Sequence, residues 1–342
     1  MLTLNHSICP ECGVGCGINI ISKDGQLMGI NPYKNHPINE GKNCKNCLDN
    51  INNIAETKQE KNYDYSQKID EITEKLKQNP EQQTTIILSG KTDNNDLKKI
   101  IEFKNKYNYN IAAYENNFTK TDEQLIPSYD EIEEADKIIT IGDIFRNSSL
   151  IARKIIHAQD NSNAETININ TTKNLTGYNS DEFKQIDTYK EITKALETIE
   201  TTDKTVIIIN ECEDYPTIID YVKNRNLKIL PLLKHPNSYS ILEEIETTQK
   251  DEIEETINNS QLLLFINENP SDFNQTDGRE VILITQNPTG EYDEIPVRQW
   301  CEKEGSFTNS EGLTQEFHDA IQDENNHLLT VEEILEEISK KL

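Results

Sequence analysis

Residues 9–47 begin with CPECGVGC and end with NEGKNCKNC, and these two runs space four cysteines as Cys9-x2-Cys12-x3-Cys16-x27-Cys44. A cubane iron–sulfur cluster takes one thiolate per iron, so three ligands on one short loop and a fourth from further along the chain satisfy its four corners. The spacing therefore predicts a small amino-terminal 4Fe–4S domain, with these four cysteines as the metal ligands.

Three glycines, Gly13, Gly15 and Gly17, lie within or directly after the first cysteine run. Glycine has no Cβ and tolerates positive φ, so the chain can wrap closely around an inorganic core with its amides turned toward the sulfurs. The glycines strengthen the prediction of a cluster-binding loop.

A structural zinc site is the alternative, because Cys9-x2-Cys12 and Cys44-x2-Cys47 form two knuckles with zinc spacing. Zinc leaves Cys16 without a role, whereas a cubane uses Cys16 and leaves Cys47 as a spare or as an alternative fourth ligand. A disulfide framework is less well supported, since the chain has seven cysteines, an odd number, and no secretory signal is recognisable.

The overall charge restricts the classes of partner. The 342 residues carry a formal net charge of -27, which opposes binding to nucleic acid and to anionic lipid. No run approaches the 18 to 20 apolar residues of a membrane span. We therefore expect a cytoplasmic protein with no nucleic-acid partner and no membrane insertion.

Beyond the cysteine segment the pattern changes to alternating strands and helices. A helix is expected within residues 63–79 and another over residues 328–342, the latter with Thr330 as N-cap and Glu333 completing a capping box. Short β-branched runs between them predict parallel strands with helices on both faces. The expected strands are residues 85–88, 111–114, 137–141, 166–169, 205–209, 228–230, 262–266 and 281–284.

The fold class predicted from this pattern is α/β, with a small 4Fe–4S domain followed by doubly wound parallel-sheet layers and no carboxyl-terminal β-barrel. The predicted divisions are an iron–sulfur domain, a helical linker, a first α/β layer, and a second α/β layer that ends in a loop and helix: residues 1–56, 57–81, 82–187 and 188–342.

The cysteine segment resembles the iron–sulfur domain of molybdopterin oxidoreductases, especially formate dehydrogenase alpha subunits, through CPECGVGCGI and the later NPYKNHPINEGKNC. In that family the last ligand follows an Asn-Glu-Gly run, which here is Asn39 to Gly41, so the resemblance favours Cys44 over Cys47 as fourth ligand. The extent of the chain is similar to that of the catalytic subunit of formylmethanofuran dehydrogenase, whose pterin-covering domain is a separate polypeptide.

Two further segments carry the resemblance. Residues 139–155, ITIGDIFRNSSLIARKI, are similar to the family's element near the pterin nucleotide, which implies cofactor-binding roles for Gly142, Arg153 and Lys154. Residues 302–315, EKEGSFTNSEGLTQ, are similar to a second family signature, which implies such roles for Asn309, Glu311 and Gly312. On the residues alone, a structural β-hairpin between the sheet and the last helix is the better explanation of the second segment.

The resemblance also exposes a difference. The family usually takes a cysteine or selenocysteine ligand for molybdenum or tungsten from a loop in its first α/β layer, with a histidine beside it. Residues 111–130 hold no Cys, His or Arg. Cys212 and Cys301 have acidic neighbours and are interpreted as incidental thiols.

Three functions follow as hypotheses. The first is a formate dehydrogenase-like oxidoreductase subunit that moves electrons between a 4Fe–4S cluster and a molybdopterin guanine dinucleotide carrying Mo or W. The second is a non-catalytic electron-transfer or assembly subunit that kept the cluster and lost the pterin metal site. The third is a zinc-stabilised scaffold. The expected partners are other redox subunits, one of them carrying a pterin-covering domain.

Overall fold

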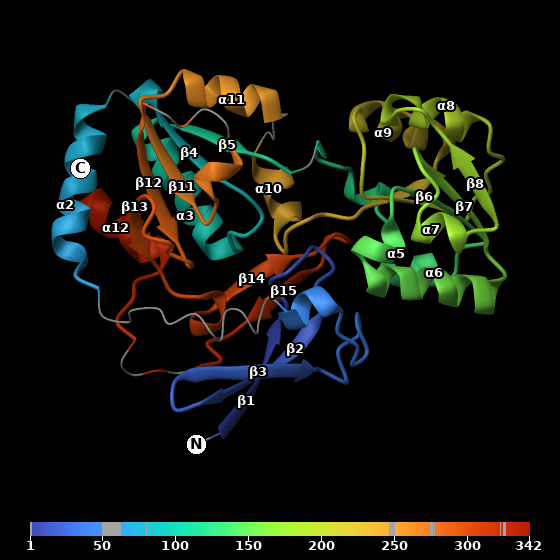
Figure 1. Ribbon diagram of the computed structural model, residues 1–342, viewed down its shortest axis with the longest axis horizontal. Helices are drawn as coiled ribbons and strands as arrows, with labels where there is room; N and C mark the ends of the chain where they lie inside the picture. The colour runs from blue at the N-terminus through green and yellow to red at the C-terminus, as the bar shows by residue number, and fades with distance from the viewer. Residues whose placement is uncertain are drawn as a thin grey trace.

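The computed structural model describes residues 2–49, 63–79, 81–115, 117–245, 250–273, 276, 278–321, 323 and 326–342. The boundary predicted between residues 56 and 57 lies outside these residues. Two α/β units stand side by side, and a small antiparallel sheet lies below them (Figure 1).

The small sheet consists of β1 (Leu2–Ile8), β2 (Gly17–Lys23) and β3 (Gln26–Pro32), all antiparallel. The β1–β2 pairing ends at Ile8 opposite Gly17, and the Cys9 amide donates a hydrogen bond to the Cys16 carbonyl at 2.8 Å. The first cysteine run is therefore a loop that this hairpin closes at both ends.

The first α/β unit has a five-stranded parallel sheet with the order β13-β12-β11-β4-β5. Its helices α2, α3 and α12 cover one face and α11 covers the other (Figure 1). The bounds are β4 (Thr84–Leu88), β5 (Asn110–Ala113), β11 (Leu262–Ile266), β12 (Glu280–Thr285), β13 (Asp293–Pro296), α2 (Tyr65–Gln78), α3 (Asn94–Tyr107), α11 (Lys250–Asn258) and α12 (Val331–Lys341).

The second unit has a five-stranded parallel sheet with the order β10-β9-β6-β7-β8. Helices α4 and α6 pack on one face, and α8 and α9 pack on the other. The bounds are β6 (Lys137–Ile141), β7 (Glu165–Asn170), β8 (Glu182–Gln185), β9 (Thr205–Ile209), β10 (Lys228–Pro231), α4 (Tyr129–Glu133), α5 (Ile144–Asn147), α6 (Ser149–Ser162), α7 (Leu175–Tyr178), α8 (Ile192–Glu197), α9 (Tyr215–Arg225) and α10 (Ser238–Glu244).

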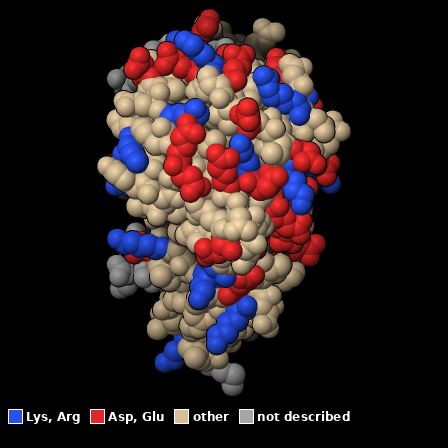
Figure 2. Space-filling model, turned by 90° about the vertical axis from the view of Figure 1, so that its right-hand side faces the viewer, with Lys and Arg blue, Asp and Glu red and all other residues tan. Residues whose placement is uncertain are grey.

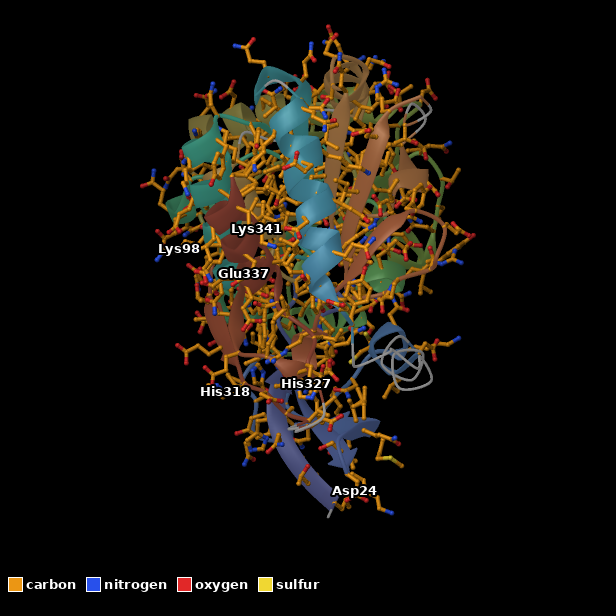
Figure 3. All side chains as sticks on the ribbon, turned by 90° about the vertical axis from the view of Figure 1, so that its left-hand side faces the viewer. Asp24, Lys98, His318, His327, Glu337 and Lys341 are labelled. Atoms are coloured by element: carbon orange, nitrogen blue, oxygen red, sulfur yellow. The ribbon has the colours of Figure 1, made fainter. Side chains whose placement is uncertain are left out.

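All eight predicted strands are confirmed, each to within one residue at either end. The expected α/β class with helices on both sheet faces is confirmed as well. The capping box of α12 is present, with Thr330 Oγ1 accepting from the Glu333 amide at 3.2 Å. Lys341 of α12 also pairs with Asp70 of α2 at 2.6 Å, and Figure 3 shows α12 lying beside α2.

The sequence predicted two successive α/β layers with a division between residues 187 and 188, but the strands are not shared between the two sheets in that way. Strands β8 and β9 lie on either side of that division but belong to one sheet, and β4 and β5 share a sheet with β11 to β13. The whole second unit is thus inserted between β5 and β11.

The surface shown in Figure 2 carries both acidic and basic side chains, and the described residues on that face form no continuous basic surface.

The segment 302–315 forms a hairpin of β14 (Gly305–Thr308) and β15 (Thr314–Phe317), which packs between the small sheet and the first unit (Figure 1). Lys303, at its start, is 6% exposed, and its ammonium group is paired with the buried carboxylates of Asp93, at 2.5 Å, and Asp96. Asp96 also accepts a hydrogen bond from the amide of Glu332 at 3.2 Å. This buried triad joins the hairpin to the first turns of α3 and α12.

The triad predicts a pH dependence of stability. Burial raises the pKa of Asp96 to about 7. The nearby Lys303 lowers this pKa and the nearby Asp93 raises it, but burial is the largest effect. A folded-state pKa above the ordinary value of about 3.9 gives stability that is present at acid pH and lost as the pH rises through 7. Asp96→Asn should remove this component. As the pH rises from 5 to 8, the free energy of unfolding of the variant should therefore rise relative to that of the wild type. Urea titrations across that range measure the difference, and a constant difference would contradict the assignment.

Candidate redox site

Five thiols gather where the small sheet meets the two α/β units. Cys9, Cys16 and Cys47 are buried, and Cys12 and Cys44 are half-buried. Cys16 interacts electrostatically with the thiols at positions 12, 44 and 47. The structure thus brings the four predicted ligands together, with Cys47 beside them, and their ligation of iron stays a prediction.

Burial is the main influence on the pKa values of these thiols. Burial raises the pKa of Cys12 to about 12 and raises the pKa values of Cys16 and Cys44. Backbone hydrogen bonds oppose this shift at Cys12, from Val14, and at Cys44, where the Cys47 amide donates to Sγ at 3.4 Å. Without metal the thiols hold their protons at neutral pH. A bound cationic core displaces these protons, and the amides already aimed at sulfur suit the thiolates that result.

The spacing of the donors bears on the zinc alternative. A zinc ion requires four donors on one tetrahedron, with sulfur at about 2.3 Å from the metal. Across the described part of the chain, which includes all seven cysteines, no group of three or more His, Cys, Asp or Glu is gathered tightly enough for a single ion. The cluster and the zinc hypotheses both stay predictions, and the substitution of Cys16 separates them.

The cysteine loop is held from outside by residues distant in sequence. The amide of Ser310 donates to the Gly13 carbonyl at 2.6 Å, and the Gly13 amide donates to the Leu233 carbonyl at 3.1 Å. Gln315 Nε2 donates to the Gly15 carbonyl at 3.0 Å, and the Tyr129 hydroxyl donates to the Val14 carbonyl at 3.1 Å. The hairpin and the second unit together fix the backbone of the loop.

These contacts explain the glycines more fully than the sequence did. A Cβ at Gly13 would lie 2.7 Å from Ser310 Oγ, and one at Gly15, where φ is +79°, would lie 2.2 Å from Gln315 Oε1. The glycines are needed because the carboxyl-terminal hairpin approaches the loop so closely.

The six residues predicted to bind a pterin cofactor lie in two places. Asn309 donates to the Val14 carbonyl at 3.4 Å, Glu311 accepts from the Tyr129 amide at 2.8 Å, and Gly312 turns the hairpin with φ of +83°. These three belong to the contacts around the cysteine loop.

The other three lie in the second unit. Arg153 pairs with Glu40 of the amino-terminal domain at 2.7 Å, and buried Lys154 pairs with Glu133 at 2.8 Å. Gly142 ends β6 with φ of +95°. Their cofactor-binding role stays a prediction, because none of the six lines the large cavity beside the cysteine loop.

This cavity, of about 970 Å³, lies at the carboxyl ends of strands from both sheets, and Cys12, Cys16 and Cys44 form part of its wall. Parallel α/β sheets bind ligands at this edge. Six lining residues have a buried polar atom without a hydrogen-bond partner among the described residues: Ser148 Oγ, Asn210 Oδ1, His235 Nδ1, Asn267 Nδ2, Gln299 Oε1 and Trp300 Nε1. Buried polar groups are normally paired, so this wall offers hydrogen-bonding groups to a polar ligand.

The cavity also contains residues that the sequence did not single out. Arg146 and Lys234 bring positive charge to the lining, which suits an anionic group, whereas Lys91 pairs at 3.2 Å with Glu268 of the same wall. His235 lines it too, with Nδ1 3.5 Å from Glu115 Oε2, a carboxylate that is itself buried and bonded to the Gly90 amide at 2.6 Å. No local spacing could have joined His235 to Glu115, because they follow strands of different sheets.

The two remaining thiols do not take part. Cys212 lies in the apolar core of the second unit, and Cys301 is fully buried. Neither lines the cavity. Of the seven cysteines, all within the described residues, Cys12, Cys16 and Cys44 line it.

Comparison with known proteins places the chain. Residues 2–50 match the family model described as the molybdopterin oxidoreductase Fe4S4 domain. The amino-terminal segment of the chain is therefore similar to the Fe4S4 domain of that family. The chain is 33% identical over 205 residues to the F420-dependent formate dehydrogenase subunit alpha of Methanocaldococcus jannaschii, a match covering 53% of this chain and 30% of that protein. It is 62% identical over 39 residues to the F420-dependent formate dehydrogenase 1 subunit alpha of Methanococcus maripaludis, covering 11% of this chain and 6% of that protein. The matches thus span less than a third of either relative.

Two solved structures share the fold of this chain. Acetylene hydratase from Pelobacter acetylenicus aligns with a TM-score of 0.68 and 10% identity, covering 98% of this chain and 69% of that one. A chain of the formyltransferase/hydrolase complex FhcABCD from Methylorubrum extorquens aligns with a TM-score of 0.55 and 11% identity, covering 82% of this chain and 96% of that one. Among the described residues, no helix is both long and apolar enough to cross a membrane.

The ligand assignment predicts the effect of Cys16→Ser. A 4Fe–4S cluster needs Cys16, whereas a zinc site built on the outer pairs does not, so this substitution should remove most of the iron and the visible absorbance of the cluster. Iron content and absorbance of anaerobically purified protein measure the result. Cys212→Ser, which changes another buried thiol, should leave both unchanged. Full metal content in the Cys16 variant would contradict the assignment.

The close contact at Gly15 predicts a second effect. Gly290 has the same φ of +79° but no atom within 4 Å of its Cβ position, so Gly290→Ala measures the backbone cost alone, about 1–2 kcal/mol. Gly15→Ala adds the clash with Gln315 and should lower the free energy of unfolding further and reduce bound iron. Denaturant unfolding and iron analysis of both variants test this. Equal losses would show that the contact with the hairpin does not matter.

Proposed function

We propose that this chain is a redox subunit of a formate dehydrogenase-like oxidoreductase, in which a 4Fe–4S cluster held by Cys9, Cys12, Cys16 and Cys44 stands at the wall of a pterin site. One observation carries the proposal: three of the four thiols line the same cavity that receives strand ends from both sheets. A cluster on these thiols would form part of the cavity wall and would therefore lie next to a ligand bound in the cavity. Electron exchange between the two requires this closeness.

The chemistry of the cavity fits a pterin dinucleotide. The unpartnered atoms of Asn210, Asn267 and Gln299 would bind the polar ring edges, and Arg146 and Lys234 would face phosphate. When bound, molybdopterin guanine dinucleotide with Mo or W supplies the two-electron redox chemistry and the cluster supplies one-electron transfer. The protein's own residues bind and orient these groups.

His235 is the candidate for proton transfer in this cavity. Its ring is mostly buried, and its Nδ1 faces the Glu115 carboxylate, which in turn is held by the Gly90 amide and by Ser238 Oγ at 2.5 Å. The Nδ1–Oε2 distance of 3.5 Å places negative charge beside the ring without a hydrogen bond, and Nδ1 has no hydrogen-bond partner among the described residues. We propose that the imidazole accepts a proton from an oxidised substrate, for which formate is the proposal because of the likeness to formate dehydrogenase alpha subunits.

The second candidate function is a non-catalytic electron-transfer or assembly subunit. It is favoured by the composition of the cavity wall: among the described residues, no cysteine outside the amino-terminal segment lines it, so no separate thiolate is offered to Mo or W. This candidate keeps the cluster and omits the pterin metal.

We further propose that other redox subunits complete the site, one of them with a domain that covers the pterin. The fold of the chain matches nearly the full length of a subunit from a complex of several different chains, FhcABCD. A cytoplasmic location accords with this proposal.

The experiment that separates the candidates is anaerobic purification from the native host with elemental analysis and pterin extraction. The catalytic proposal expects about four irons and one Mo or W per chain, an oxidised pterin fluorophore, and formate oxidation with a dye acceptor. Iron without Mo, W or pterin would establish the second candidate instead. Zinc without iron would overturn both.

A matched pair of variants locates the pterin. Asn267→Leu, in the cavity wall, should reduce extractable pterin while leaving the iron content unchanged. Asn224→Leu, an exposed position of α9, should change neither. Equal pterin content in the two variants would remove Asn267 from the site.

A further inference from the structure

The buried triad at the start of the hairpin has unequal numbers of positive and negative groups. The Lys303 ammonium group contacts the carboxylates of Asp93, at 2.5 Å, and of Asp96, and all three side chains are almost fully buried. With both carboxylates ionised, the triad keeps one uncompensated negative charge away from water. Burial of such a charge is costly, so the closed structure favours a proton on one of the carboxylates.

Asp96 is the carboxylate that takes this proton. Burial raises the pKa of Asp96 to about 7, and the repulsion of Asp93 adds to the increase, whereas Lys303 lowers the pKa. A carboxyl group with this pKa gains and loses its proton close to neutral pH. The charge on the triad therefore changes in that range.

The helix packed against the triad brings no second cation to it. From α12, Asp96 accepts a hydrogen bond from the backbone amide of Glu332 at 3.2 Å. The Lys99 ammonium group, one turn further along α3, is paired with Glu336 of α12 at 2.7 Å. Among the described residues, Lys303 is thus the cation that contacts the two carboxylates.

The triad also lies at one end of the connection that holds the cysteine loop. The first turn of α3 bonds the hairpin again through Asn94 Nδ2, which donates to Ser306 Oγ at 3.0 Å. At the far end of the same strand, the Ser310 amide donates to the Gly13 carbonyl at 2.6 Å. The contact at Lys303 and the contact with the cysteine loop are therefore the two ends of β14 and its turn.

We propose that the triad is a pH-sensitive switch, which holds the hairpin against the cysteine loop while it keeps its proton and loosens the hairpin when that proton is lost. The loop is then held more firmly at acid pH than at alkaline pH. This inference goes beyond the proposed function and does not require a bound cluster, because it concerns contacts within the chain itself.

The test is hydrogen exchange of the whole protein at pH 6 and pH 8, followed by mass spectrometry on peptides that span residues 305–317 and corrected for the intrinsic effect of pH on exchange. A carboxyl group with a pKa of about 7 in the closed state and about 3.9 in water makes opening about tenfold more favourable across this interval. Wild type should lose protection by that factor.

Two variants remove the imbalance of charge. Asp96→Asn and Asp93→Asn each leave one carboxylate for one ammonium group, so the protection of the hairpin should change little between the two pH values. Asparagine is also a good helix N-cap, so Asp93→Asn keeps the cap of α3. Because the two variants make the same prediction, either one decides the question if the other does not fold.

Asp293→Asn is the matched control, because Asp293 of β13 is likewise a carboxylate in contact with lysines, Lys68 and Lys75 of α2. This variant should keep the tenfold response of wild type. An equal loss of protection in wild type and Asp96→Asn would overturn the switch. Loss of protection in β6 together with the hairpin would overturn it too, since the whole chain would then be unfolding.

Discussion

The backbone clamp on the cysteine loop is the constraint on which the rest of the site depends. A loop rich in glycine has many conformations available in the unfolded chain and has little tendency to hold one of them by itself. Here the carbonyls of residues 13, 14 and 15 accept hydrogen bonds from Ser310, Tyr129 and Gln315. Because these carbonyls are buried, each needs its donor. The hairpin and the second unit are thereby brought to one point, and the positions of the thiols follow.

The same clamp sets the electrostatics of the cavity. It seats three thiols in a wall whose other parts come from strand ends of two different sheets. The thiols are neutral until metal replaces their protons, and several polar atoms of the wall have no partner within the protein. A strongly acidic exterior surrounds this interior. Burial is the largest cause of the raised pKa values of Cys12 and Cys44, and backbone hydrogen bonds oppose it.

Much of the fold could be predicted because its signals are local. Strands such as 137–141 and 205–209 are short β-branched runs, and the capping box at Thr330 needs only four residues. Sheet membership is not local: β4 and β9 have equally apolar sequences, and nothing in either run specifies its neighbour. The site divides in the same way. The cysteine spacing was readable, since a cluster imposes it directly. The role of Lys303 in a buried triad was not, because Asp93 and Asp96 are far away in sequence.

The insertion of the second unit into the first has a consequence for biosynthesis. Domains generally fold as the chain leaves the ribosome, amino-terminal parts first. Strands β4 and β5 must wait for β11 to β13, however, and the cysteine loop must wait for residues 310 and 315. The inserted unit can complete its sheet while the earlier segments remain open. The loop can therefore take its final shape only at the last stage of the protein's production, when the carboxyl-terminal hairpin has emerged, and a cluster on its thiols would be held from that stage on.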